Sequence, residues 1–470
     1  MRHCCVWNSL RIISSGGNYS RSRLPQQHAS AGRNFSRLAF VRDALGDLRH
    51  PRGTQIPALD ALRTLAILMV IAGHFPEAGK TQFPQYARLL DGTLFTFGWT
   101  GVDLFFVLSG FLIGRQLWKE QLRTGTINVG RFITRRGFRI WPLYVFIALI
   151  SPALDDRWSY KWPDWAFLSN YSFGRVEGGW SLSTEEQFYV LAPLVILASG
   201  RFLRARGWFA VLLASLIAVS GARWWTAHKL VDAGRTLAQI KTAMYTPFHL
   251  HSEGLIIGLL LALVSVIAPR LLDGSPEARP RVLTTAGIAC IVAAMLHVAS
   301  GTVFPFLSLG MIYGSLMVAL LAIGCDTLRL LQARIFYVVS RLSYGMYLNH
   351  LAVLRWIAPS VARAVKAVGG QNPLTLFATL GIIVAISALL AVGTFVLIEH
   401  PFLVLRERVQ YTASSSRREQ SGRAPVVIPE RVYAFDRIAD VKEESRIIPH
   451  SIPRVVGSND SPPAQHGDLL

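Results

Sequence analysis

Long apolar segments alternate with short polar connections along most of this chain. Ten such segments occur, near residues 59–78, 94–114, 138–154, 185–200, 208–226, 250–268, 282–299, 304–323, 338–358 and 375–398. A helix needs about 20 apolar residues to cross a bilayer, so several segments have close to the minimum length. Prolines interrupt the third and fourth segments, but neighbouring helices can satisfy the backbone groups that a proline leaves free. The pattern predicts an all-α, polytopic membrane bundle of about ten transmembrane helices.

Basic residues between the segments predict the orientation, because cytoplasmic loops of membrane proteins are enriched in Lys and Arg. Loops 115–137, 201–207, 269–281 and 324–337 carry more of them than the loops between. These four loops are therefore predicted inside, and an even number of spans places both termini in the cytoplasm. The net charge of +20 is mostly explained by this topology, so no nucleic-acid partner is expected.

Composition agrees with a lipid bilayer as the surroundings. Of the 470 residues, 51% are hydrophobic and 16% are charged, against about 25% charged in a soluble domain. The four cysteines show no metal-ligand spacing and no disulfide framework. No metal is expected.

Two polar stretches flank the hydrophobic region 57–403. Residues 1–56 are rich in Arg and Ser, with only Asp43 and Asp47 as acids, and contain no sustained apolar run. They are therefore not a secretory signal, and a basic, disordered cytoplasmic extension is the simplest interpretation, with an organelle transit peptide as the alternative. The polar residues 404–470 are predicted to form a disordered cytoplasmic tail.

The first segment carries three ionisable side chains, Asp60, Arg63 and His74. Eleven helical steps rotate about three full turns plus 20°, so Arg63 and His74 share one face and lie about 16 Å apart along the axis. Asp60 falls close to the same face. Ionisable groups inside a membrane are costly and mark functional sites. A histidine that only bonds a neighbouring helix remains the alternative.

The second segment contains Asp103 and Ser109 in an otherwise apolar helix. Asp103 needs a partner there, which His74 or an arginine can supply. Gly110 and Gly114 form a small-xxx-small pair, which favours close helix packing in membranes.

Charged residues also lie at the ends of the third and fourth segments. Arg136 and Arg139 are spaced i, i+3 and share a helical face, where two guanidinium groups suit a phosphate; anchoring by positive charge is the simpler interpretation. In the fourth segment, Ser183 and Glu186 fit a capping box. Capping leaves Glu185 unexplained, and this residue must be paired or protonated in a membrane.

Two further patterns concern the ninth segment and the loop 155–184. Ser343, Tyr347 and His350 recur at i, i+4 and i+7 and predict one polar stripe that faces the bundle interior. We expect this stripe to contact either the substrate or another helix. The loop 155–184, predicted outside, is crowded with aromatic residues, including Trp162 and Trp165. They suit an interfacial aromatic belt or, alternatively, a platform on which a sugar stacks.

The order of these motifs resembles the acyltransferase-3 family of integral membrane acyltransferases over residues 57–403. Four blocks carry the resemblance: the arginine and histidine separated by ten residues, GVDLFFVLSGFLI at 101–113, RGFRIWP at 136–142 and WSLSTEEQFY at 180–189. Tyr347 with His350, and Glu399 with Pro401, also fit. One run departs from the family's usual His-x-Arg-x-Asp, because His251 and Glu253 replace the arginine and the aspartate after His249.

The resemblance implies an O-acyltransferase, in a bacterial inner membrane, that transfers an acyl group from cytoplasmic acyl-CoA, usually acetyl-CoA, to a hydroxyl of a carbohydrate or glycolipid acceptor. It implies His74, Glu185 and Asp103 as catalytic residues, with His74 as general base or acyl carrier, and Arg63, Arg136 and Arg139 as donor ligands. Further site candidates are Asp60, Ser109, Tyr347, His350, His249 and Glu253. A proton-coupled transporter is the alternative function, although no inverted repeat is visible. The oligomeric state is left open.

Overall fold

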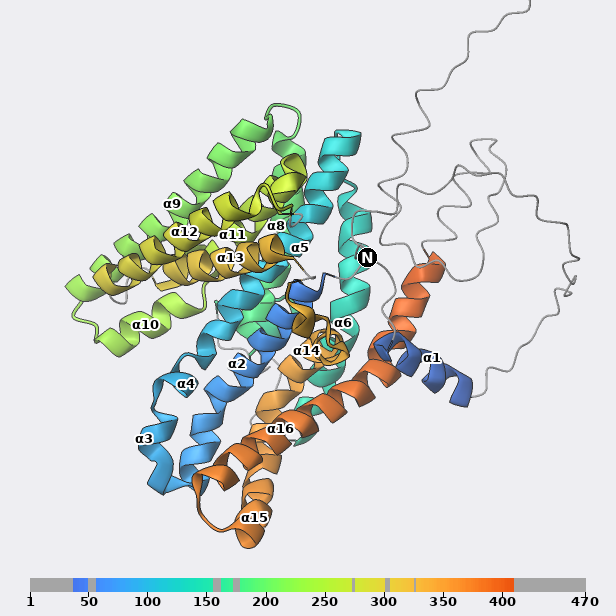
Figure 1. Ribbon diagram of the computed structural model, residues 1–470, viewed down its shortest axis with the longest axis vertical. Helices are drawn as coiled ribbons and strands as arrows, with labels where there is room; N and C mark the ends of the chain where they lie inside the picture. The colour runs from blue at the N-terminus through green and yellow to red at the C-terminus, as the bar shows by residue number, and fades with distance from the viewer. Residues whose placement is uncertain are drawn as a thin grey trace, which may run out of the picture. The chain divides into compact units, whose positions relative to one another are not determined.

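A computed structural model describes residues 37–49, 56–154, 162–171, 178–272, 275–300, 305–324 and 327–409. Within these ranges the chain is helical and contains no strand (Figure 1). The predicted all-α fold is therefore confirmed. Disorder was predicted for residues 1–56 and 404–470. Of these, residues 37–49 and 404–409 are helical, and residues 1–36, 50–55 and 410–470 lie outside the described residues.

Each predicted apolar segment overlaps one long helix of the structure, although some segments also include a neighbouring short element. These helices are α2 (Pro57–Gln82), α5 (Gly101–Thr124), α6 (Val129–Leu154), α8 (Gly179–Ser199), α9 (Ala205–Asp232), α11 (Glu253–Ile267), α12 (Arg279–Ser300), α13 (Pro305–Ile323), α14 (Arg334–Ala352) and α16 (Pro373–Thr394). Shorter elements connect or extend them: α1 (Arg37–Arg49), α3 (Ala87–Leu90), α4 (Thr93–Thr96), α7 (Trp162–Trp165), α10 (Leu237–Tyr245), α15 (Ala358–Gly369), the 3₁₀ turns η1 (Pro84–Tyr86), η2 (Gly98–Thr100), η3 (Phe248–Leu250), η4 (Pro269–Leu271) and η5 (Arg329–Gln332), and the π-helical turns η6 (Val353–Ile357) and η7 (Phe395–Glu399).

Six helical stretches among the described residues are long and apolar enough to cross a membrane: Pro57–Gln82, Gly98–Thr124, Ala205–Asp232, Arg279–Val298, Pro305–Ile323 and Pro373–Val409. The remaining predicted spans fall on α6, α8, α11 and α14. Helix α11 has only 15 residues, and the other three carry charged side chains. The count of ten spans and the cytoplasmic placement of both termini stay predictions.

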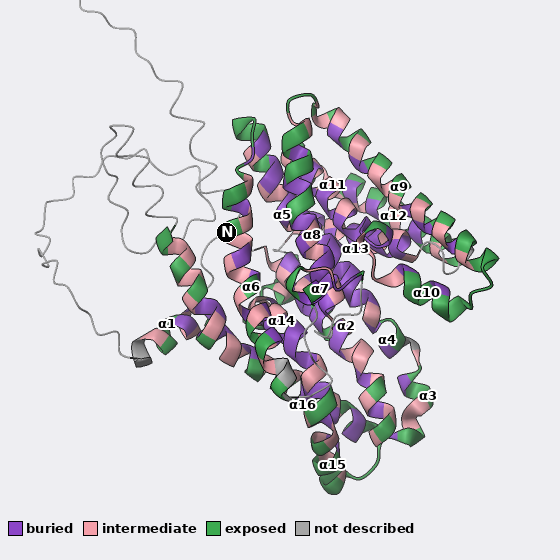
Figure 2. Ribbon diagram, turned by 180° about the vertical axis from the view of Figure 1, so that it is seen from behind, coloured by how far each residue is buried: buried purple, intermediate pink, exposed green. Residues whose placement is uncertain are grey.

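Exposed apolar faces support the membrane setting. Figure 2 shows buried residues concentrated in α2, α5 and α14, whereas α9 and α12 present exposed faces. Large apolar side chains are exposed on α8, α9 and α12, including Val195, Ile217, Ile291 and Met295. Contiguous exposed apolar surface marks contact with a membrane or another protein. Such exposed apolar faces suit helices that contact lipid.

Helix α5 is the centre of the bundle and contacts α2, α8, α11 and α13 (Figure 1). Its approach to α11 depends on glycine. A Cβ atom added at Gly110 would lie 2.1 Å from the Leu255 carbonyl oxygen, and one added at Gly258 would lie 2.2 Å from the Val107 carbonyl oxygen. The predicted packing role of Gly110 is therefore confirmed.

A second close approach places η2 against α2. A Cβ atom added at Gly98 would lie 2.3 Å from the Gly73 backbone nitrogen, and one at Gly73 would lie 2.7 Å from the Trp99 nitrogen. No other residue type fits this contact without displacement. It brings Trp99 beside the turn of α2 that carries His74.

Helix α1 lies within the stretch 1–56 and packs against α14 and the residues that follow η7. Asp47 lies 3.3 Å from Nε2 of the buried His400, and the Tyr337 hydroxyl donates to the Asp47 carbonyl oxygen at 3.0 Å. Phe40 also packs edge-on against His400, with ring centroids 5.3 Å apart. These contacts join α1 to α14 and to the segment after η7.

Candidate active site

Two histidines of different helices meet inside the bundle. Nδ1 of His74 lies 2.9 Å from the Val70 carbonyl oxygen, and Nδ1 of His350 lies 2.6 Å from the Tyr347 carbonyl oxygen. A carbonyl oxygen only accepts, so each Nδ1 carries the hydrogen and each neutral ring keeps its lone pair on Nε2. The rings pack edge to face with centroids 5.2 Å apart. Nε2 of His350 is buried and has no hydrogen-bond partner among the described residues.

Four arginines from three helices form what we call the arginine cluster: Arg63 of α2, Arg136 and Arg139 of α6, and Arg341 of α14. Arg139 interacts electrostatically with the other three and with Glu399 of η7. Like charges gathered in a bundle interior repel and are costly unless anions compensate them. The structure thus brings the three predicted donor ligands together, and adds Arg341.

Glu185 supplies one of the compensating carboxylates. Its oxygens accept hydrogen bonds of 2.8 Å from the Ser109 hydroxyl and of 2.8 Å from the Tyr189 hydroxyl. It also interacts electrostatically with Arg136, whose guanidinium lies 5.6 Å from the centre of the Tyr189 ring. Glu185 is therefore paired, as its place in a membrane helix requires, but through Ser109 and Tyr189 and not through a bond to His74.

Glu186 has a different partner from the one the sequence predicted. Helix α8 begins at Gly179, with Gly178 in a left-handed conformation at its N-cap. Ser183 therefore lies inside the helix, and the predicted capping box is wrong. The helix starts earlier because glycine adopts this positive φ of 77° without strain. Glu186 instead accepts a 3.0 Å hydrogen bond from the Trp141 indole nitrogen.

Asp60 joins α2 to α14 beside the arginine cluster. It accepts a 2.7 Å hydrogen bond from the Ser340 hydroxyl and interacts electrostatically with Arg63 and Arg341. Its carboxylate therefore offsets two positive charges at the end of α2 remote from His74. Arg341 had no motif in the sequence; its charge inside the ninth apolar segment was the available signal.

The polar stripe of α14 faces the interior, as predicted. Ser343, Tyr347 and His350 are all buried. The Tyr347 hydroxyl shares a 2.5 Å hydrogen bond with the Ser181 hydroxyl at the start of α8, and the Ser343 hydroxyl donates to the Ser340 carbonyl oxygen at 2.8 Å. Tyr347 and Ser343 thus bond protein partners, which leaves His350 as the member of the stripe that faces His74.

Asp103 pairs with a histidine that is not His74. Its Oδ1 lies 2.9 Å from Nε2 of His251, and both side chains are buried. The expected partner His74 is therefore wrong, and the arginine that interacts electrostatically with Asp103 is Arg223, which forms no hydrogen bond with it. The tight packing of α5 on α11 decides the pairing with His251, because it carries Asp103 to the residues just before α11. Nδ1 of His251 also lies 2.6 Å from the Tyr245 carbonyl oxygen.

Glu253 and His249 lie in different surroundings, the first buried and the second exposed. Glu253 forms a fully buried ion pair with Arg223 of α9, with a nitrogen–oxygen distance of 2.9 Å, and the Arg223 guanidinium lies 4.1 Å from the centre of the Phe306 ring. Sequence reasoning missed Arg223, although a charge inside an apolar segment was its signal. His249 is exposed and shares a 3.0 Å hydrogen bond with the Tyr171 hydroxyl. Partial burial lowers the pKa of His249.

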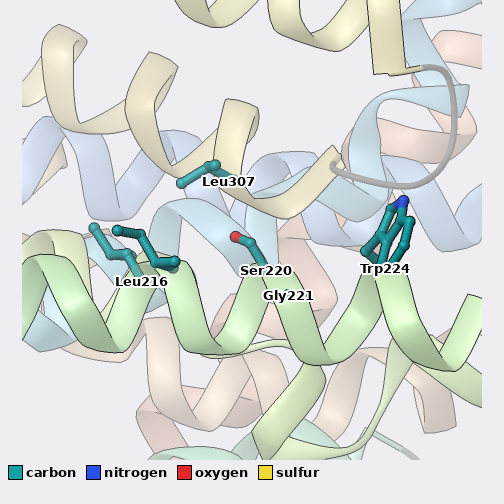
Figure 3. A pocket seen from close by; sticks show the side chains of 6 residues that line it. Leu216, Ser220, Gly221, Trp224 and Leu307 are labelled. Carbon is teal, nitrogen blue, oxygen red and sulfur yellow. The ribbon is translucent and has the colours of Figure 1, made fainter.

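Two other features of the described residues lie apart from this chemistry. No group of three or more His, Cys, Asp and Glu side chains there is arranged to hold a metal ion. An apolar cavity of about 350 Å³ lies between α9 and α13 (Figure 3), and none of its lining residues is a predicted site residue: Leu216, Ile217, Ser220, Gly221, Trp224 and Leu307.

Comparison with known proteins decides the family. The family profile described as Acyltransferase domain, of the acyltransferase-3 family, matches residues 56–392. The chain belongs to the acyltransferase-3 family. The predicted family is thereby confirmed, and, together with the apolar helices, it indicates a multi-pass membrane protein. No solved structure matches.

Curated relatives point the same way over a shorter region. The chain is 31% identical over 163 residues to the O-acetyltransferase OatA of Staphylococcus aureus strain NCTC 8325 / PS 47, which covers 30% of this chain and 24% of the relative. The same identity and coverage hold for OatA of strain COL. This chain therefore spans about a quarter of the length of these relatives.

Proposed function

We propose that the protein is an O-acyltransferase of a bacterial inner membrane. It transfers an acyl group, which we propose to be acetyl, from acyl-CoA on the cytoplasmic side to a hydroxyl of a carbohydrate or glycolipid. The observation that carries this proposal is the joint placement on α2 of His74, with its Nε2 lone pair available, and Arg63 of the arginine cluster. A base and an anion-binding group therefore share one rigid element.

The arginine cluster suits the phosphates of CoA. Guanidinium groups bind phosphate oxygens in bidentate fashion, and a bound anion relieves the repulsion among the four side chains. Arg63 and His74 lie about 16 Å apart along α2. CoA is an extended molecule, so a donor held by its phosphates at the cluster can direct its thioester along the bundle toward His74.

Two routes at His74 fit this arrangement. In the first, Nε2 accepts the hydroxyl proton while the acceptor oxygen attacks the thioester carbon and the carbon–sulfur bond breaks. In the second, Nε2 attacks the thioester carbon and CoA leaves as the thiolate; the acceptor oxygen then displaces the imidazole, and the hydroxyl proton passes to the thiolate. Both routes need the neutral ring with a free Nε2. The relatives named O-acetyltransferase support acetyl as the group transferred.

The proton-coupled transporter is less well supported. It is based on the buried ionisable residues between Asp60 and His350, and these lie within residues 56–392, which match the acyltransferase domain. Nothing in the described helices favours it over acyl transfer.

Labelled acetyl-CoA tests the proposal directly. Membranes that contain the full chain are incubated with radiolabelled acetyl-CoA, and label is followed in free acetate and in the glycan and lipid fractions. We expect turnover that membranes lacking the protein do not show. Gene deletion followed by mass analysis of surface glycans then identifies the acceptor by a lost acyl mass. A well-inserted protein that neither transfers nor hydrolyses the donor would contradict the proposal.

A further inference from the structure

An aromatic cluster surrounds the buried Asp103–His251 pair. Trp180 of α8 lies 4.7 Å from Tyr245 of α10, and Trp99 of η2 lies 5.9 Å from Tyr245, measured between ring centroids. These three side chains are partly exposed. We call them the aromatic platform. They come from three separate elements, so only the fold assembles them.

The Asp103–His251 pair holds this platform in place. His251 stacks on the buried Phe306 with centroids 3.5 Å apart and lies 5.5 Å from the Trp180 ring. Both of its nitrogens face oxygen acceptors, the Asp103 carboxyl at 2.9 Å and the Tyr245 carbonyl at 2.6 Å. Such an arrangement holds a proton between the imidazole and the carboxyl and fixes the ring orientation. A mobile platform would lose entropy on binding a ligand, whereas this one is preorganised.

The platform begins next to the proposed catalytic histidine. The Trp99 backbone packs against Gly73, the residue before His74. On its other side, the loop that carries Tyr171 is joined to the connection after α10, since the Thr246 hydroxyl donates to the Asn170 carbonyl oxygen at 2.9 Å. All these segments belong to the side of the membrane that the charge pattern predicts to be outside, where an acceptor arrives.

We propose that Trp99, Trp180 and Tyr245 form the acceptor subsite and bind a sugar ring by stacking, with Asp103 and His251 as positioning residues. This inference rests on the proposed function, because the sugar is the acceptor. Aromatic faces pack against the C–H faces of a pyranose, while the indole N–H and phenol O–H at their edges remain available to its hydroxyls. An acyl chain has no groups that could use these polar edges.

A binding measurement tests the subsite without requiring turnover. Radiolabelled methyl glycosides of glucose, galactose and N-acetylglucosamine are equilibrated with the purified full chain in detergent. We expect at least one to bind, and Trp180→Leu to weaken that binding about tenfold. Trp180→Phe keeps a π face and should recover most of the affinity. Trp225→Leu is the matched control, since Trp225 is 56% exposed near the predicted outer end of α9.

Kinetics then separate positioning from general damage. For Asp103→Asn, the KM for the bound glycoside should rise about tenfold more than the KM for acetyl-CoA, because the change loosens the acceptor platform and not the arginine cluster. Equal loss in both constants, wild-type binding by Trp180→Leu, or equal loss in Trp225→Leu would overturn the subsite. So would a wild-type protein that binds none of the glycosides. If glycoside binding depends on Trp180 but acetyl-CoA is never turned over, the proposed function fails while the sugar site stands.

Discussion

The imidazole of His74 packs edge to face against the imidazole of His350, and each ring donates its Nδ1 hydrogen to a carbonyl oxygen of its own helix. Both rings therefore keep a lone pair on Nε2 in their neutral forms. His74 is half-buried and His350 is buried, so His74 is the one an arriving substrate reaches first.

His74→Ala should abolish acyl transfer. Loss of a general base or acyl carrier costs at least about 10²–10⁴-fold in rate, while Ala preserves the helix and membrane insertion. Transfer from labelled acetyl-CoA in membranes with matched protein levels measures the effect. His228→Ala is the control, because the exposed His228 has the same local geometry, with Nδ1 3.1 Å from the Trp224 carbonyl oxygen. If His74→Ala kept near-normal transfer while His350→Ala lost it, the catalytic histidine would be His350 of α14 and not His74 of α2.

Arg136→Ala and Arg139→Ala should each weaken use of the donor. Loss of one charge-assisted phosphate contact costs about 1.5–3 kcal/mol, or roughly tenfold to a hundredfold in apparent affinity for acyl-CoA. The KM for acetyl-CoA is the measurement. Arg131→Ala serves as control, since Arg131 is exposed on the same helix. An unchanged KM for acetyl-CoA in both variants would show that the two arginines only set the membrane orientation and do not bind the donor.

Gly110→Ala should destabilise the bundle. The added methyl group would lie 2.1 Å from the Leu255 carbonyl oxygen, so α5 and α11 must separate, at a cost of about 1–3 kcal/mol. The midpoint of thermal unfolding in detergent should fall. In Gly381→Ala the new methyl group meets no atom within 4 Å, and the midpoint should stay. Equal midpoints in the two variants would show that this contact does not limit stability.

Arg223→Met should also lower the unfolding midpoint, for an electrostatic reason. It leaves the fully buried Glu253 without its ion-pair partner, which costs about 3–5 kcal/mol. Combining it with Glu253→Met removes the uncompensated charge and should restore most of the stability. If the unfolding midpoint of the double variant is no higher than that of Arg223→Met alone, the loss of stability comes from lost packing on Phe306 and not from the unpaired charge.

Topology reporters should distinguish the two sides of the membrane. Fusions are expected to report cytoplasm after residues 120, 204, 275 and 330, and the outside after residues 165 and 365, because Lys and Arg concentrate in the first set of loops. An outside signal after residue 120 would reverse the donor side, since Arg136 and Arg139 of the arginine cluster lie on the helix that follows.

The sequence by itself determined the elements of this protein. Apolar runs locate the helices because burial in lipid demands about 20 apolar residues wherever a helix crosses, and the motifs around Arg63, Asp103 and Arg136 identify the family. Helices α6, α8 and α14 are less distinct by hydropathy, since they carry the charges of Arg139, Glu185 and Arg341. Arg139 interacts electrostatically with Arg341, and Glu185 does so with Arg63 and Arg136.

Only the tertiary structure decided which side chains meet. Asp103 binds His251 instead of His74 because glycines allow α5 and α11 to approach closely, and no local pattern encodes that contact. His350 faces His74 because α14 packs on α2. Helical periodicity fixes which residues share a face, but the partner of that face depends on helix packing between distant parts of the chain. The pairing of the buried polar groups is therefore a property of the fold.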